Sequence, residues 1–164
     1  MNARGEIDLP DSVLERLDIA IASIHMPCFK DERTIDNVTA AYEKVMEHPY
    51  VDIIGHPDDG RFPVDMKRLV KKAKETGTLL EVNNSSLRPE GFRENTKENC
   101  LEMVKECKAQ GVMIVLGSDS HVDADIAEYP YAEEILRETD FPEELVANVS
   151  LEKLKACIKH WKKL

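Results

Sequence analysis

Three largely apolar runs in this chain each end in side chains that can bind a metal ion. The runs and the side chains that follow them are 19–24 with His25, 51–55 with His56, and 112–116 with Asp119 and His121. Segments with helical periodicity separate the runs, and strands that alternate with helices favour a parallel sheet or a barrel segment. In such folds the loops that follow the strands gather on one face. The pattern therefore predicts an α/β fold that collects its chemistry at one edge.

The spacing of apolar and turn residues predicts where each element lies. We expect strands over the ranges 17–24, 50–55, 78–83 and 112–116, with a last short strand over 146–149. Helix starts are expected at the N-caps Thr34, Thr96 and Ser150, and Pro63 fits the first turn of another helix. Gly77 and Gly111 are expected to end helices. The chain is expected to form a single domain over 1–164.

Imidazole and carboxylate groups at equivalent strand ends suit zinc, manganese or iron. A single histidine is more often exposed, or hydrogen-bonded within the protein, than bound to a metal ion. The prediction of a metal site therefore depends on the whole set of residues. That set is His25, His56, Asp119 and His121. His48 and His160 do not follow strands, and we expect both to be solvated.

Other polar residues near the predicted edge have two interpretations each. Glu81 lies inside an apolar run, where it either supports the site or makes an ordinary buried hydrogen bond. Arg88 and Arg93 follow that run, and Arg88 is our candidate for binding a substrate phosphate through its planar guanidinium. The alternative is a solvent-facing loop arginine. Asp58 and Asp59 precede a glycine, and an Asp-Asp-Gly sequence is most typical of a turn.

The composition excludes several classes of partner. The chain has 164 residues, a formal net charge of -10 and a pI of about 5.0, and such an acidic surface repels nucleic acid and anionic lipid. No signal pattern or long apolar span is visible, so we expect a cytoplasmic protein. The four cysteines form no CxxC pair, and Cys100 and Cys107 are expected to be core residues of a helix. No GxSxG, P-loop or GxGxxG motif is present.

An ordered set of motifs resembles the PHP (polymerase and histidinol phosphatase) domain family, and most closely its small bacterial trinuclear-zinc phosphatase branch. The matching segments are SIHMP at 23–27, IGHP at 54–57, LEVNNSS at 80–86 and LGSDSH at 116–121. The resemblance implies a metal-dependent phosphoesterase with up to three zinc ions, manganese or iron being alternatives. It also implies a small phosphorylated substrate.

The resemblance covers only the C-terminal part of the family domain. The HxH motif, the further histidines and the bridging glutamate of the family's first strands have no counterpart here. The resemblance thus implies a partial (β/α)7 barrel that lacks its first strands. His25 and His56 would share one ion with the missing glutamate, whereas Asp119 and His121 would each join missing ligands on another ion. The open barrel is expected to need a complementing N-terminal fragment, self-association or a rearranged sheet.

We therefore predict a phosphatase that hydrolyses a phosphomonoester with metal-activated water in the intact domain. No residue is identified as the general acid. Two alternatives remain open for the chain itself. One is a non-catalytic remnant, or half of a split enzyme that acts as a binding module. The other is an amidohydrolase-like metal hydrolase, although no lysine falls in a predicted strand to serve as its bridging group.

Overall fold

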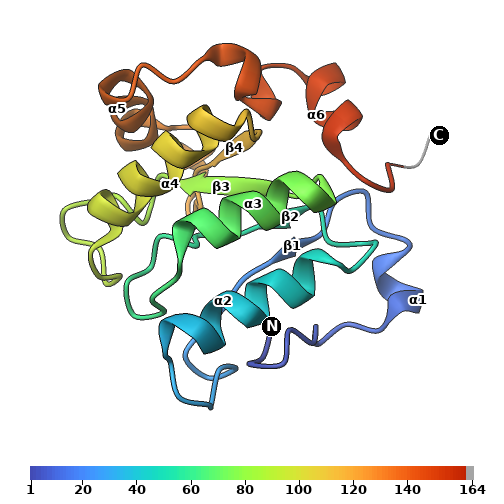
Figure 1. Ribbon diagram of the computed structural model, residues 1–164. Coiled ribbons are helices and arrows are strands. Elements are labelled where there is room, and N and C mark those ends of the chain that lie inside the picture. Colours follow the sequence, from blue (N-terminus) through green and yellow to red (C-terminus); the bar gives the residue numbers. More distant parts are fainter. Residues whose placement is uncertain (162–164) are drawn as a thin grey trace.

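The computed structural model describes residues 1–161, which fold around a four-stranded parallel sheet. The strands lie side by side in chain order, as β1 (Ile21–Ala22), β2 (Ile53–Ile54), β3 (Leu79–Asn83) and β4 (Ile114–Gly117). Figure 1 shows the elements following one another along the sheet from the N-terminus to the C-terminus. The predicted α/β class is confirmed. A partial barrel stays a prediction, and residues 162–164 of the predicted domain lie outside the described residues.

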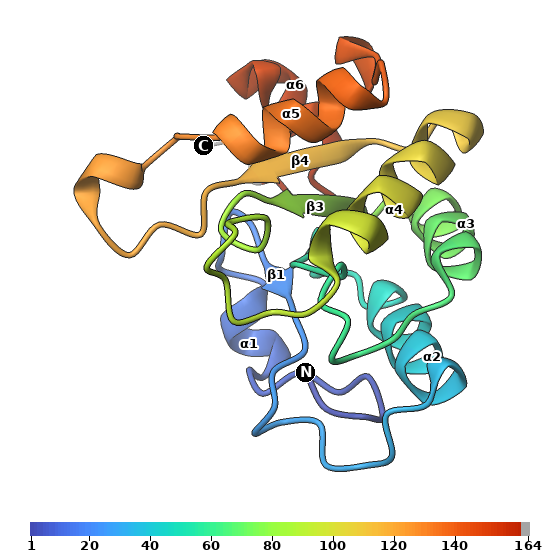
Figure 2. The same cartoon turned by 90° about the vertical axis from the view of Figure 1, so that its left-hand side faces the viewer.

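Helices connect the strands, and several of them cover one face of the sheet. The described α-helices are α1 (Asp11–Leu14), α2 (Ile35–Met46), α3 (Met66–Thr76), α4 (Thr96–Gln110), α5 (Pro130–Glu138) and α6 (Leu151–Cys157). Short 3-10 helices follow at η1 (Asp123–Asp125), η2 (Glu143–Leu145) and η3 (Ala147–Val149). Figure 2 shows α2, α3 and α4 on one side of the strands, while the loop after β4 projects to the other side.

The two faces of β3 have different surroundings. Leu80 and Val82 point toward the helices and belong to the main apolar core. Leu79 belongs to a second, smaller cluster on the opposite face. Glu81 follows Leu79 on that opposite face because side chains alternate along a strand. This face is therefore apolar at the amino end of the sheet and polar at its carboxyl end.

Helix ends agree well with local sequence signals. The Thr34 side chain accepts a hydrogen bond from the Asn37 backbone N–H at 3.1 Å, and Ser150 caps α6 in the same way. Gly77 (φ 66°) and Gly111 (φ 68°) end α3 and α4 in the left-handed conformation that favours glycine.

Two expected helix starts are wrong. Helix α3 is capped by Asp65 and begins at Met66, so Pro63 lies before the helix rather than in its first turn. Helix α4 begins at Thr96 itself, because the Thr96 hydroxyl donates to the Ser86 carbonyl oxygen at 2.8 Å instead of capping the helix. At Thr96, a hydrogen bond to a residue distant in sequence thus replaces the capping hydrogen bond that the local pattern predicts.

The regular strands are shorter than the apolar runs that predict them. Strands β1 and β2 each have two residues, although the runs predict eight and six. The expected last strand over 146–149 is mostly the 3-10 helix η3, and only Val146 forms a bridge, with Ile114. The apolar runs are longer than the hydrogen-bonded strands because residues just before and just after each strand also pack in the core.

Strand β1 lies at one edge of the sheet. Among the described strands it pairs only with β2, and its Ile21 side chain is 58% exposed. The terminal ammonium of Met1 donates to the Ser23 carbonyl oxygen at 2.8 Å, just beyond the strand. An unpaired edge of this kind is able to accept another strand.

The amino end of the sheet is closed by a buried aspartate. Asp52 is fully buried, and its carboxylate accepts the backbone N–H groups of Ala20 at 3.0 Å and Lys159 at 2.9 Å. The His160 side chain is only 12% exposed and lies 3.4 Å from the same carboxylate. The expectation that His160 is solvated is therefore wrong. His48 contacts Asp11 at 3.2 Å and is 26% exposed.

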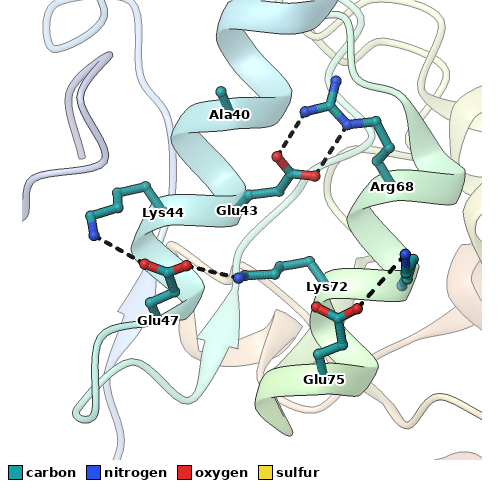
Figure 3. A pocket seen from close by; sticks show the side chains of 8 residues that line it. Ala40, Glu43, Lys44, Glu47, Arg68, Lys72 and Glu75 are labelled. Atoms are coloured by element: carbon teal, nitrogen blue, oxygen red, sulfur yellow. Dashed lines mark hydrogen bonds and ion pairs between the residues drawn. The ribbon is translucent and has the colours of Figure 1, made fainter.

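Charged side chains line a groove of about 510 Å³ between α2 and α3. Figure 3 shows that Glu43 contacts Arg68, and that Glu47 lies between Lys44 and Lys72. These charges neutralise one another across the two helices. The groove therefore resembles a helix–helix contact more than a ligand site.

Removing Arg68 is expected to have a small effect on stability. Arg68→Ala should lower the free energy of unfolding only slightly, because solvent screens the exposed side chain. The loss should shrink in 1 M NaCl, and chemical denaturation at two salt concentrations measures it. Lys71→Ala is the control, since its ion pair with Glu75 is long at 3.9 Å. A loss in Arg68→Ala that clearly exceeds the loss in Lys71→Ala and does not change with salt would contradict this interpretation.

None of the helices in the described part of the chain combines the length and the apolar character needed to cross a membrane.

Candidate metal and anion site

The candidate site lies at the carboxyl end of the sheet, where loops follow the strands. His25 comes three residues after β1 and His56 two residues after β2. Asn83 ends β3, and Asp119 comes two residues after β4. Because neighbouring parallel strands point the same way, these loops converge.

The two histidines are in direct contact. Their ring centroids are 4.9 Å apart and the rings are nearly perpendicular, at 82°. His56 is 7% exposed, and its Nδ1 atom has no hydrogen-bond partner among the described residues. The Ser23 hydroxyl lies 3.0 Å from His25 Nε2, within hydrogen-bonding distance. The pair thus presents imidazole nitrogens that the rest of the described chain leaves largely unused.

The surroundings of the two imidazoles favour their neutral forms. Burial lowers the pKa of His56 to about 4, and the Arg93 guanidinium contributes to this shift. Burial and the same guanidinium also lower the pKa of His25. Neutral imidazole is the form that binds metal ions, so both side chains are ready for that role near pH 7.

Glu81 supports the histidine pair from β3. Its Oε2 atom accepts the His56 backbone N–H at 2.7 Å and the Asn83 side-chain N–H at 3.2 Å. Burial raises the pKa of this carboxyl group. A Cβ atom at Gly117 would overlap the Glu81 carboxylate, so glycine leaves it room. Glu81 therefore fixes the backbone that carries His56.

Arg93 is the most central cation of the candidate site. Its side chain is 6% exposed, and its guanidinium donates to Ser86 Oγ at 2.8 Å, Asn83 Oδ1 at 3.3 Å and Asp119 Oδ2 at 3.2 Å. The Nε atom has no hydrogen-bond partner among the described residues. Arg88, by contrast, is 41% exposed and pairs with Asp125 at 2.7 Å. From the sequence, Arg88 is the candidate for the substrate phosphate, whereas the structure places Arg93 beside the histidines.

Asp119 and His121 are not brought onto the histidine pair. Asp119 faces Arg93, and His121 is exposed with its Nδ1 atom 3.0 Å from the Asp119 carbonyl oxygen. Within residues 1–161, no three His, Cys, Asp or Glu side chains gather closely enough to hold one ion. His25 and His56 therefore fit two ligand positions of a metal site. The other ligands of such a site would come from residues outside this pair.

Asp58 is a buried residue that sequence analysis assigned to a turn. It is fully buried, and neither carboxylate oxygen has a hydrogen-bond partner in the described chain. Burial raises its pKa to about 7. A fully buried carboxylate without donors is unusual, and the only sequence signal is a second aspartate in a short turn. His56 (φ 37°) and Asp119 (φ 49°) also adopt left-handed backbone conformations, which the sequence pattern does not predict.

Several bacterial proteins are similar to this chain over nearly its whole length. A probable phosphatase of Clostridium novyi is 46% identical over 161 residues, which are 98% of this chain and 65% of that protein. A probable phosphatase of Acetivibrio thermocellus is 42% identical over 96% of this chain and 64% of its own length. A third, from Clostridium botulinum, is 40% identical over 98% of this chain and 65% of its own.

The chain thus spans slightly less than two thirds of the length of these curated relatives. No family model matches it.

Proposed function

We propose that this chain is the C-terminal part of a PHP-type metal-dependent phosphatase that hydrolyses a small phosphomonoester. The observation that carries the proposal is the contact between His25 and His56 at the ends of adjacent strands. The names of the relatives support the phosphatase class. Zinc, or alternatively manganese or iron, would polarise the phosphate ester and lower the pKa of water when bound there.

The residues of this chain would bind and orient. His25 and His56 would hold one ion, and Glu81 would keep the His56 backbone in place through its 2.7 Å hydrogen bond. Asp119 and His121 would serve further ions. For Asp119 this requires exchange of its contact with Arg93, which would leave that guanidinium free to hold the substrate phosphate. Arg88 is a second candidate for the same anion.

A complementing segment is part of the proposal. Two imidazoles fall short of the three protein ligands usual for catalytic zinc, and β1 has an unpaired edge beside them. An N-terminal fragment equivalent to the unmatched third of the relatives would add a strand at this edge and supply the remaining ligands. A second copy of the chain is the alternative partner.

The test is reconstitution. We expect the zinc- or manganese-loaded chain to hydrolyse p-nitrophenyl phosphate slowly or not at all alone. Mixing it with the unmatched fragment of the Clostridium novyi relative should raise the rate at least ~100-fold, because positioned catalytic groups and metal ions each contribute at least that much. The fragment alone is the control. A bound fragment that brings metal but no hydrolysis of any phosphomonoester would refute the phosphatase proposal.

If the chain is instead an amidohydrolase-like enzyme, the reconstituted complex would hydrolyse amide or cyclic amide substrates and leave phosphomonoesters intact. If it is a binding module, the complex would form and hydrolyse neither class.

A further inference from the structure

Phe92 is an exposed aromatic residue beside the candidate site. Its side chain is 72% exposed, the largest value among the exposed large hydrophobic residues of the described chain. It lies in the loop between β3 and α4, directly before Arg93. A single exposed hydrophobic side chain is common on protein surfaces, so any role of Phe92 depends on the groups that surround its ring.

Two arginine side chains lie next to the Phe92 ring. The guanidinium carbons of Arg61 and Arg93 lie 4.9 and 5.2 Å from the ring centroid. Both guanidiniums also approach the same atom, Asp59 Oδ2. The two guanidiniums are therefore not placed directly above and below the ring. The ring is held by these arginines while much of its remaining surface stays open.

A cavity adjoins this ring. It measures about 280 Å³ and is lined by Ser85, Arg88, Glu90, Gly91, Phe92 and Arg93. Its lining combines an aromatic surface with two guanidiniums, and one of these reaches Asp119 in the candidate site at 3.2 Å. Arg88 pairs with Asp125 and Arg93 with Asp119, so an anion would have to exchange with these carboxylates to reach the guanidiniums.

We propose that this cavity binds a phosphomonoester that carries a planar aromatic base, a nucleoside monophosphate being the class. The base would stack on the open side of Phe92, and the phosphate would lie against Arg93 toward the histidine pair. Aromatic stacking suits any base because each has a flat π-face. The proposal deepens the proposed function, on which the placement of the phosphate rests.

The test measures binding without catalysis. The chain is kept in EDTA and titrated with adenosine monophosphate, ribose 5-phosphate and adenosine in an isothermal calorimeter. We expect adenosine monophosphate to bind at least ~5-fold more tightly than ribose 5-phosphate, because stacking of one base contributes about that factor or more. Phe92→Ala should remove the difference by weakening only the ligands with a base. Phe92→Tyr should retain it.

Ile126→Ala is the matched control, because Ile126 is also a large exposed side chain, at 66%, on the loop after β4. Equal affinities for adenosine monophosphate and ribose 5-phosphate in the wild-type chain would overturn the proposal. So would an equal loss in Phe92→Ala and Ile126→Ala, or no binding of adenosine monophosphate at ~10 mM. Failure of the phosphatase proposal looks different, since adenosine monophosphate would then bind but stay intact in the reconstituted, metal-loaded complex.

Discussion

His25→Ala and His56→Ala are each expected to abolish zinc retention by the isolated chain. The two rings are in contact, and each variant leaves a single imidazole where the wild-type chain offers two. Affinity should fall at least ~100-fold, since even the loss of a group that only supports a ligand costs 10–100-fold. The measurement is zinc titration of the metal-free chain, followed by metal analysis after gel filtration.

His48→Ala is the control for this experiment, because His48 lies away from the pair and contacts Asp11. Equal losses in all three variants would indicate adventitious surface binding and contradict the prediction. The pH dependence has a definite sign. The pKa of His56 is lowered to about 4, so protons compete weakly with zinc there, and retention should change little between pH 8 and 6.

Asp58→Asn is expected to stabilise the metal-free chain at pH 7–8, whereas Asp52→Asn should destabilise it. Both aspartates are fully buried, but only Asp52 receives backbone N–H donors. Replacing Asp52 places an amide N–H against these donors and should cost about 1–3 kcal/mol. Replacing Asp58 removes a carboxylate that has no donor, with an expected gain of roughly 2 kcal/mol or more. Urea denaturation in EDTA measures both.

The pH dependence separates the Asp58 effect from a general change in packing. The pKa of Asp58 is raised from 3.8 to about 7 in the folded chain, so the folded state binds more protons than the unfolded state between these values. The destabilisation caused by Asp58 is therefore absent below about pH 4, grows as the pH rises from 4 to 7 and is complete above pH 7. The gain in Asp58→Asn should therefore vanish near pH 4. A pH-independent gain, or destabilisation at pH 8, would contradict the prediction.

Helix ends were predictable from sequence where the signal is local. Thr34 and Gly77 act within one turn of the backbone, and the structure confirms both. Thr96 carries the same local signal, but a hydrogen bond to Ser86, ten residues earlier, takes its hydroxyl. Sequence spacing contains no information about such a contact, because it depends on how the loop after β3 folds back.

The candidate site shows the same division. The positions of the candidate ligands after predicted strands indicated a common edge of the sheet, and the structure brings His25 and His56 into contact there. The choice between Arg88 and Arg93 was not predictable, because both follow the same strand and differ only in burial. The isolation of Asp58 also depends on what surrounds it in space rather than on its neighbours in the chain.

The left-handed backbones of His56 and Asp119 have an evolutionary consequence. Glycine adopts positive φ without the steric cost that other residues bear there. A library of this chain selected for heat resistance alone should therefore accumulate glycine at both positions and lose its metal ligands. Retention of histidine and aspartate under such selection would mean that these side chains contribute more to folding than their backbone geometry costs.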